Sequence, residues 1–244
     1  MNQPDQHMTL VEHLTDLRYR LVKALQGIAI GAAICTYFSE PILDVIRQPV
    51  VKFLPTGGLV FTGVMDKFLA HLKVGVLSGL VLTCPYWLYH VWKFISPGLY
   101  KNERRYAAGF IVTGTLLFLL GVCFVYFLVY PAAFEFLFSI GGNVDKPMIT
   151  INEYLGFFMM TTVMFGFAFE LPVILVLLAM IGIIDGNFLK KNRRYAIVVL
   201  AALSAILTPP DAVSMVMMLV PLCLLYESSV WLIHFLIKPT PERA

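Results

Sequence analysis

Long apolar segments, separated by shorter polar ones, are the feature that most restricts the fold of this chain. Most approach or exceed the roughly 20 residues that an α-helix needs to cross about 30 Å of hydrocarbon. The segments cover about residues 21–39, 68–92, 106–130, 154–184, 195–208 and 212–237. Only 14% of the residues are charged and 59% are hydrophobic, whereas about 25% of a soluble domain is charged. We therefore predict an all-α polytopic membrane protein with six transmembrane helices, in a single integral membrane domain over residues 1–244.

The distribution of basic residues predicts how the chain is oriented in the membrane. These residues gather before the first apolar segment, in residues 93–105, in residues 185–194 and after the last segment. The other side of the membrane receives only Arg47, Lys52, Lys67, Lys73 and Lys146. Because segments rich in lysine and arginine stay in the cytoplasm, both termini are predicted to be cytoplasmic. The first apolar segment lacks a small-residue cleavage site, so we expect it to be retained.

Two of the predicted spans are short. The fifth has about 14 apolar residues, or roughly 20 Å of helix. The sixth is interrupted by Glu227 and the two serines that follow it. Short spans thin the bilayer or are sheltered by neighbouring helices, so we expect the fifth and sixth spans to depart from a plain bundle.

The residues before the first span have the pattern of an amphipathic helix. Leu10, Leu14, Leu17 and Leu21 share one face at 100° per residue. The opposite face carries Glu12, Asp16, Arg20 and Lys23, with His13 beside them. We expect this helix to lie on the cytoplasmic membrane surface and to run into the first span.

Two acidic residues near the predicted cytoplasmic surface have both a structural and a functional interpretation. Asp16 is spaced to pair with Arg20 one turn later, and Glu103 would begin the third span, where a carboxylate stabilises the helix dipole. Alternatively, the two carboxylates form an acidic site for a cationic ligand, because carboxylates bind the planar guanidinium group with two hydrogen bonds. The residue types alone leave both interpretations open.

Two further acids lie within the predicted spans. Glu170 falls near the middle of the fourth span, in the stretch FGFAFELPVI, and no basic residue shares its segment. Pro172 is expected to kink that helix, because proline removes a backbone hydrogen bond. Glu227 lies in the sixth span. Such acids face protein or water rather than lipid. They fit a proton or ion relay, a docking site for another membrane helix, or a polar contact inside the bundle.

The chain lacks the sequence signatures of common catalytic sites. It contains no G-x-x-x-x-G-K-[ST] phosphate loop, no H-E-x-x-H metal motif and no G-x-S-x-G nucleophile motif. Its four cysteines fall singly in four apolar segments, which argues against a disulfide framework or a metal site. The net charge of +3 is too small to indicate nucleic-acid binding. We therefore expect neither an enzyme nor a bound metal or cofactor.

Several short motifs occur along nearly the whole chain, over about residues 8–238. They are HLTDLRYRL (13–21), VWKFISPGLYKNERR (91–105), YFLVYP (126–131), FGFAFELP (165–172), LTPPD (207–211) and LLYE (224–227). In this order they resemble the TatC family, the multispanning subunit of the twin-arginine protein translocase. The loop FISPGLYKNERR and the element FELP make the combination specific.

The resemblance implies a receptor for folded proteins with twin-arginine signal peptides, driven by the proton-motive force. It implies a concave, glove-shaped bundle in the bacterial inner membrane, in contact with lipid, with copies of itself and with single-span partners of the TatA and TatB types. The family's site residues correspond to Asp16, Arg18, Phe94 and Glu103 for signal-peptide binding, to Glu170, Thr208 and Glu227 for polar docking in the membrane, and to Pro49 in the first external loop. Asp16 stands where the family usually has a glutamate, and its side chain is one methylene shorter.

A second function remains open from the residues: a proton-coupled secondary transporter of small solutes, with Glu170 and Glu227 as its relay. Such a transporter needs acids along a continuous pathway and usually an internal repeat, and no repeat is evident in the sequence. The polar loops carry the kind of residues that a receptor requires. They therefore favour the receptor.

Overall fold

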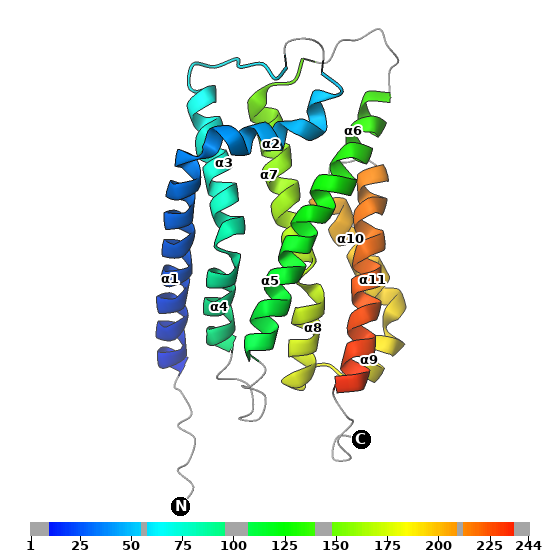
Figure 1. Cartoon of the computed structure of the whole chain (residues 1–244). Helices are drawn as coiled ribbons and strands as arrows, with labels where there is room; N and C mark the ends of the chain where they lie inside the picture. The colour runs from blue at the N-terminus through cyan, green and yellow to red at the C-terminus, as the bar shows by residue number, and fades with distance from the viewer. Residues whose placement is uncertain (1–9, 55–57, 96–106, 140–147, 209–211, 237–244) are drawn as a thin grey trace, which may run out of the picture.

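The computed structural model describes residues 10–54, 58–95, 107–139, 148–208 and 212–236, and these ranges are almost entirely helical (Figure 1). In chain order the helices are α1 (Leu10–Tyr37), α2 (Ser39–Val51), α3 (Asp66–Leu82), α4 (Cys84–Ile95), α5 (Ala107–Phe124), the π-helix η3 (Val125–Val129), α6 (Tyr130–Ser139), α7 (Ile151–Ala168), α8 (Leu171–Met180), α9 (Gly186–Lys191), α10 (Arg193–Leu207) and α11 (Ala212–Leu236). An isolated β-bridge joins Val60 to Thr150. The prediction of an all-α fold is confirmed for the described residues.

The helices run between two ends of the structure (Figure 1). One end, at the bottom of Figure 1, holds the start of α1, the end of α4, the start of α5, α9 and the end of α11. We call it the basic end, after Arg18, Arg20, Lys23, Lys93, Lys190, Lys191 and Arg193. The opposite end, which we call the α2 end, holds α2 and the starts of α3 and α7. Helix α1 thus begins at the basic end, and helix α11 ends there. An even number of membrane crossings would place the two ends of the chain in this way.

Three described helical stretches are long and apolar enough to cross a membrane: Ala108–Ser139, Ile151–Met180 and Ala212–Phe235. At most five such spans result if two bent helix pairs count as one span each. These pairs are α1 with α2, bent by 86°, and α3 with α4, bent by 58°. Helix α10, which corresponds to the predicted fifth span, has 15 residues. Its predicted shortness is confirmed, while its crossing of the membrane stays a prediction.

The expectation of a short sixth span is wrong. Helix α11 continues through Glu227 and both serines for 25 residues. The hydroxyl groups of Ser228 and Ser229 donate hydrogen bonds to the carbonyl oxygen of Leu225, at 2.7 and 2.6 Å. Their polar groups are therefore satisfied within the helix, and they do not interrupt it.

The N-terminal region and the first connector also differ from the prediction. No separate surface helix precedes the first span, because residues 10–37 form one helix of 28 residues. The sequence places no proline in this range to separate its amphipathic and apolar parts. The predicted connector over residues 40–67 contains helix α2, which buries Leu43, Ile46 and Val50.

Prolines lie beside two of the breaks between consecutive helices, at Pro85 and Pro172. Helix α4 begins at Cys84, directly before Pro85, and proline disfavours helical geometry in the residue that precedes it. The indole nitrogen of Trp87 donates to the carbonyl oxygen of Leu80 at 3.0 Å, which satisfies a backbone acceptor at this break. The expected interruption at Pro172 is confirmed, since α7 ends at Ala168 and α8 begins at Leu171.

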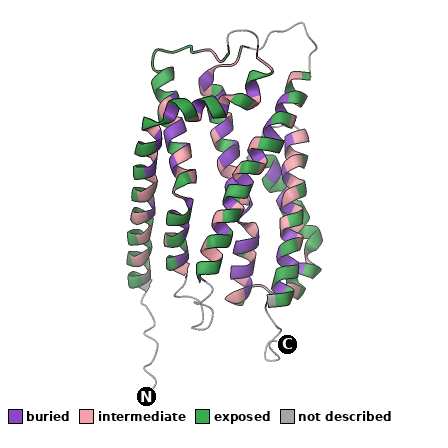
Figure 2. Ribbon diagram, in the orientation of Figure 1, coloured by how far each residue is buried: buried purple, intermediate pink, exposed green. Residues whose placement is uncertain are grey.

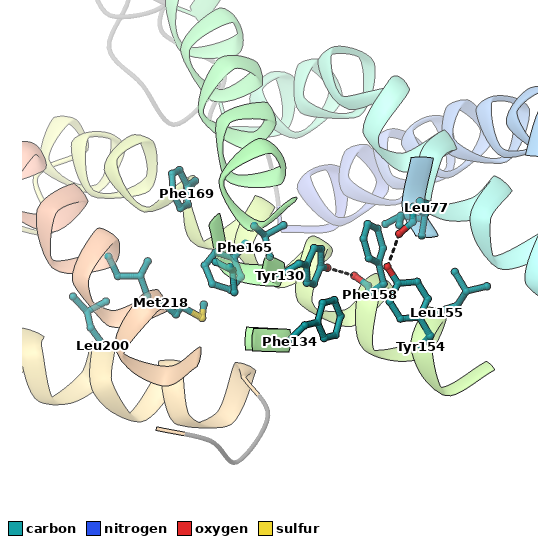
Figure 3. Close-up of a cluster of buried hydrophobic side chains, with 14 of the residues drawn as sticks. Leu77, Tyr130, Phe134, Tyr154, Leu155, Phe158, Phe165, Phe169, Leu200 and Met218 are labelled. Carbon is teal, nitrogen blue, oxygen red and sulfur yellow. Dashed lines mark hydrogen bonds between the residues drawn. The ribbon is translucent and has the colours of Figure 1, made fainter. Parts of the chain in front are cut away.

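Aromatic side chains form the centre of the largest core cluster (Figure 3). Tyr130 is fully buried, and its hydroxyl group donates to the carbonyl oxygen of Phe158 at 2.7 Å. Phe134 stacks on the Tyr130 ring, with ring centroids 6.0 Å apart. Many residues on the outward faces are exposed (Figure 2). Many of the exposed residues are large and apolar, as expected for a protein whose surrounding solvent is lipid.

Candidate functional site

At the basic end, Asp16 already binds a guanidinium group. The Nε atom of Arg20 donates to Oδ2 of Asp16 at 2.6 Å, and the exposed fractions of the two side chains are 14% for Arg20 and 21% for Asp16. Arg18, on the same helix, is exposed. The expected pair between Asp16 and Arg20 is therefore confirmed. The contact also shows that this carboxylate can accept a guanidinium in its present surroundings.

The other predicted signal-binding residues belong to the end of α4 and the segment that follows. Phe94 lies in the last turn of α4 and is half-buried. Glu103 lies outside the described residues, so its role stays a prediction. Helix α4 ends and helix α5 begins at the same end of the structure as the start of α1, which carries Asp16 (Figure 1).

Glu170 occupies the break between α7 and α8. Its side chain is buried, and its Oε1 atom has no hydrogen-bond partner. A Cβ atom on Gly114 of α5 would lie 3.0 Å from Oε2, so the carboxyl group packs directly against the backbone of α5. In the described part of the chain, no basic side chain forms an ion pair with Glu170. The acid thus lacks a charged partner, as the sequence indicated.

Two polar side chains near Glu170 were not singled out from the sequence. Cys84, the first residue of α4, is fully buried within the electrostatic reach of Glu170 and close to the hydroxyl group of Thr115. Thr115 donates its own hydroxyl hydrogen to the carbonyl oxygen of Ile111 at 2.8 Å. The unpartnered acid therefore sits where α4, α5 and α8 meet. In the sequence, only Pro172, two residues after Glu170, indicates that the helix breaks at this point.

Thr208 ends α10 as a buried polar residue. Its hydroxyl group donates to the carbonyl oxygen of Ser204 at 2.8 Å. Ser204 is itself fully buried and donates to the carbonyl oxygen of Leu200 at 2.8 Å. Thr208 therefore satisfies its own donor inside α10.

Pro49 lies within α2, where it has a clear structural consequence. Proline lacks a backbone N–H, so the carbonyl oxygen of Val45, four residues earlier, loses its usual helical donor. The hydroxyl group of Tyr126 in η3 donates to this oxygen at 2.8 Å. Tyr154 of α7 donates in the same way to the carbonyl oxygen of Ile46. Two tyrosines thus hold α2 against the rest of the bundle.

A polar network at the α2 end was also missed from the sequence. Asp66 accepts hydrogen bonds from the backbone N–H groups of Thr62 and Gly63, at 2.9 and 2.6 Å. Its other oxygen accepts from the side-chain amide of Asn152 at 2.5 Å, and Asn152 accepts from Lys73 at 3.0 Å. The network joins the start of α3 to the start of α7. No motif signals it, because Asp66 and Asn152 are 86 residues apart.

Glu227 is paired rather than isolated. The Nη2 atom of Arg193, at the start of α10, donates to Oε2 of Glu227 at 2.7 Å, and both side chains are more than a third exposed. The arginine belongs to the basic segment 185–194, so the acid lies level with the basic end. This position differs from that of Glu170, which is buried and has no charged partner.

The sequence of the whole chain now identifies its family. Residues 12–221 match the family model described as Sec-independent protein translocase protein (TatC). The chain belongs to the TatC family. A TatC protein of Carboxydothermus hydrogenoformans is 39% identical over 236 residues, covering 96% of each chain. That of Escherichia coli is 35% identical over 235 residues, covering 96% of this chain and 91% of the relative.

Solved structures of TatC have the same fold. A crystal structure of the twin-arginine translocase receptor TatC matches with a TM-score of 0.81 at 34% identity, covering 91% of this chain and 99% of the other. A second TatC crystal structure gives a TM-score of 0.80 over 93% of this chain. The resemblance stated from the motifs is therefore confirmed.

Membership of the TatC family fixes the broad function. The protein is a membrane component of Sec-independent protein translocation, and TatC is not an enzyme family. A small-solute transporter is not favoured, because the family is a translocase. The relay proposed for that function also loses support, since Glu227 is ion-paired with Arg193.

Proposed function

We propose that this TatC protein is the core receptor and scaffold of the twin-arginine translocation system. It binds twin-arginine signal peptides of folded proteins through the Asp16 region and recruits single-span partners of the TatA and TatB types. Export is driven by the proton-motive force. The six spans form a concave bundle in the bacterial inner membrane, with both termini and the basic end in the cytoplasm. The observation that carries the proposal is the contact between Asp16 and the guanidinium group of Arg20.

The geometry of that contact favours arginine as the ligand. Arg20 uses its Nε atom and one oxygen of Asp16, so a second guanidinium can approach the other oxygen or displace Arg20. A helical pair four residues apart contributes only about 0.3–0.5 kcal/mol. Displacing it therefore lowers the affinity for an incoming guanidinium by only about two-fold. Lysine cannot replace arginine fully, because an ammonium group lacks the planar fork that pairs with two oxygens.

The remaining signal-binding residues extend this surface. Arg18 is exposed beside Asp16, and Phe94 offers an aromatic side chain for the apolar residue that follows the arginine pair. Glu103 supplies the second carboxylate of the acidic site. The two carboxylates together match the two positive charges of the signal.

Partner docking uses a different part of the molecule. Glu170 is buried without a charged partner, and helix α10 is too short to cross an undistorted bilayer. A thinned bilayer beside α10 brings water and polar groups of partner helices closer to the membrane centre. We assign Glu170, Thr208 and the neighbourhood of Glu227 to this docking role, and Pro49 to the external surface of the protein.

Photocrosslinking of a twin-arginine signal peptide to membrane vesicles tests the receptor assignment. Asp16→Ala and Glu103→Ala are each expected to abolish the crosslink, while the protein remains inserted in the membrane. Asp44→Ala is the matched control, since Asp44 forms a comparable pair with Arg47 at 3.1 Å on α2. Undiminished crosslinking in both Asp16→Ala and Glu103→Ala would refute the assignment.

A further inference from the structure

Helices α1 and α4 pack closely against each other near the basic end. A Cβ atom on Gly27 of α1 would lie 2.3 Å from the ring of Tyr86, so this ring rests directly on the α1 backbone. One turn closer to the basic end, α1 carries Lys23 and α4 carries His90. Residues four apart share a helix face. Lys23 and His90 therefore lie along the same contact between the two helices.

Three cations converge on this point. The charges of Arg20, Lys23 and Lys93 all act on the His90 ring. Lys93 is exposed and lies over the ring of Tyr89, with Nζ 5.5 Å from the ring centroid. Among the described residues, neither Lys23 nor Lys93 has an ion-pair partner.

One carboxylate partly compensates this charge, because Asp16 pairs with Arg20. Two positive charges remain, together with the Nδ1 atom of His90, which is buried without a hydrogen-bond partner. We call the surface formed by Arg20, Lys23, His90 and Lys93 the α1–α4 basic patch. Its cations can be neutralised only by a group from outside the described chain.

Aromatic and apolar side chains continue the patch toward the membrane centre. Tyr89 and Tyr86, which follow Lys93 along α4 toward the membrane centre, are both exposed. Tyr86 packs edge-on against His90, with ring centroids 4.7 Å apart. Leu82, four residues before Tyr86 and farther from the basic end, is exposed. From the basic end inward, the surface thus carries positive charge, then tyrosines, then exposed apolar side chains. This order matches that of a phospholipid, whose phosphate is followed by its interfacial region and its acyl chains.

We propose that the α1–α4 basic patch binds the headgroup of an anionic phospholipid. The phosphate accepts hydrogen bonds from Lys23 and Lys93 and neutralises their positive charges. The acyl chains cover the apolar surface next to Tyr86. An acidic protein segment would pair with the same cations but would leave the exposed apolar surface beside Tyr86 uncovered. The patch meets the signal-binding surface at Arg20, which pairs with Asp16, but its proposed lipid ligands are Lys23 and Lys93, which the signal-binding surface does not use.

Native mass spectrometry of the detergent-purified protein, titrated with phosphatidylglycerol, tests the proposal. Each basic residue near a membrane surface contributes about 1 kcal/mol to the binding of anionic lipid. The double variant Lys23→Gln/Lys93→Gln is therefore expected to bind phosphatidylglycerol about 30-fold more weakly. The matched control is Lys190→Gln/Lys191→Gln, which removes two cations of α9 at the same end and should bind like the wild type.

Two further ligands and one further measurement separate the possible occupants. Phosphatidylcholine with the same acyl chains should bind at least ten-fold more weakly than phosphatidylglycerol, and millimolar inorganic phosphate should not displace the lipid. Phosphatidylglycerol should raise the unfolding temperature of the wild type more than that of the double variant. The proposal is wrong if the double variant binds phosphatidylglycerol as the wild type does. It is also wrong if millimolar inorganic phosphate displaces the lipid fully, or if phosphatidylcholine binds as tightly as phosphatidylglycerol.

Discussion

The close contact between α1 and α3 allows a quantitative prediction for Gly79→Ala. A Cβ atom at this position would lie 2.3 Å from the backbone nitrogen of Ala32, whereas ordinary contact begins at 3.4 Å. The difference, 3.4 − 2.3 = 1.1 Å, must be met by moving one helix away from the other, because the obstructing atom belongs to the backbone. Overpacking of this kind costs about 1–3 kcal/mol.

A matched glycine isolates this packing cost. Alanine also stabilises a helix relative to glycine by about 0.5–1 kcal/mol, and this gain applies equally to Gly156→Ala in α7. No atom lies within 4 Å of a Cβ at Gly156, so that variant carries the gain without the clash. The difference between the two variants is therefore the packing cost alone. It corresponds to about 2–12 °C in unfolding temperature for a protein of this size.

The assay is thermal unfolding of both variants in the same detergent and at the same heating rate, because unfolding of membrane proteins is often irreversible. Gly79→Ala should unfold at a lower temperature than Gly156→Ala. Equal temperatures would show that α1 and α3 can separate without loss of stability. The inferred close packing would then be wrong.

Three other substitutions test individual contacts. Glu170→Gln should retain much of the export of a folded reporter, because an amide keeps the hydrogen-bonding capacity, whereas Glu170→Leu should lose it; equal export by both would make the acid only structural. Tyr126→Phe removes the donor to the carbonyl oxygen of Val45 and should lower stability by about 0.5–1.5 kcal/mol, measured as unfolding temperature against the wild type. Glu227→Gln should change stability by less than about 1 kcal/mol, since exposed ion pairs contribute little, but should reduce export because Glu227 belongs to the proposed docking region; unchanged export would exclude Glu227 from docking.

The sequence predicted the features that depend on short stretches of the chain. Apolar length and scarcity of charge predicted membrane helices, and Pro172 predicted the break beside Glu170. The spacing of Asp16 and Arg20 predicted their ion pair. Each of these follows from backbone geometry or from the cost of placing charge in hydrocarbon, and both act within a few turns of one helix.

Other features depend on which helices become neighbours. Arg193 and Glu227 are 34 residues apart, and Val45 and Tyr126 are 81 apart. No local pattern indicates that either pair meets. The interruption that the sequence predicted at Glu227 and its two serines was wrong. Serine hydroxyl groups can bond either to their own helix or to other groups, and the sequence does not show which.

By itself, the sequence determined that this is a helical membrane protein, that one of its helices breaks beside Pro172, and that Glu170 lacks a basic residue in its own segment. Only the tertiary structure decided that Glu227 is paired while Glu170 is not, that Tyr126 compensates the carbonyl freed by Pro49, and that α1 and α4 bring together a basic patch without an acidic partner for Lys23 and Lys93 in the described part of the chain. The physical reason is the distance along the chain over which each interaction acts. Hydrophobicity and backbone hydrogen bonding act on neighbours in sequence, whereas the partner of a buried or charged side chain is set by the packing of helices that are distant in the chain.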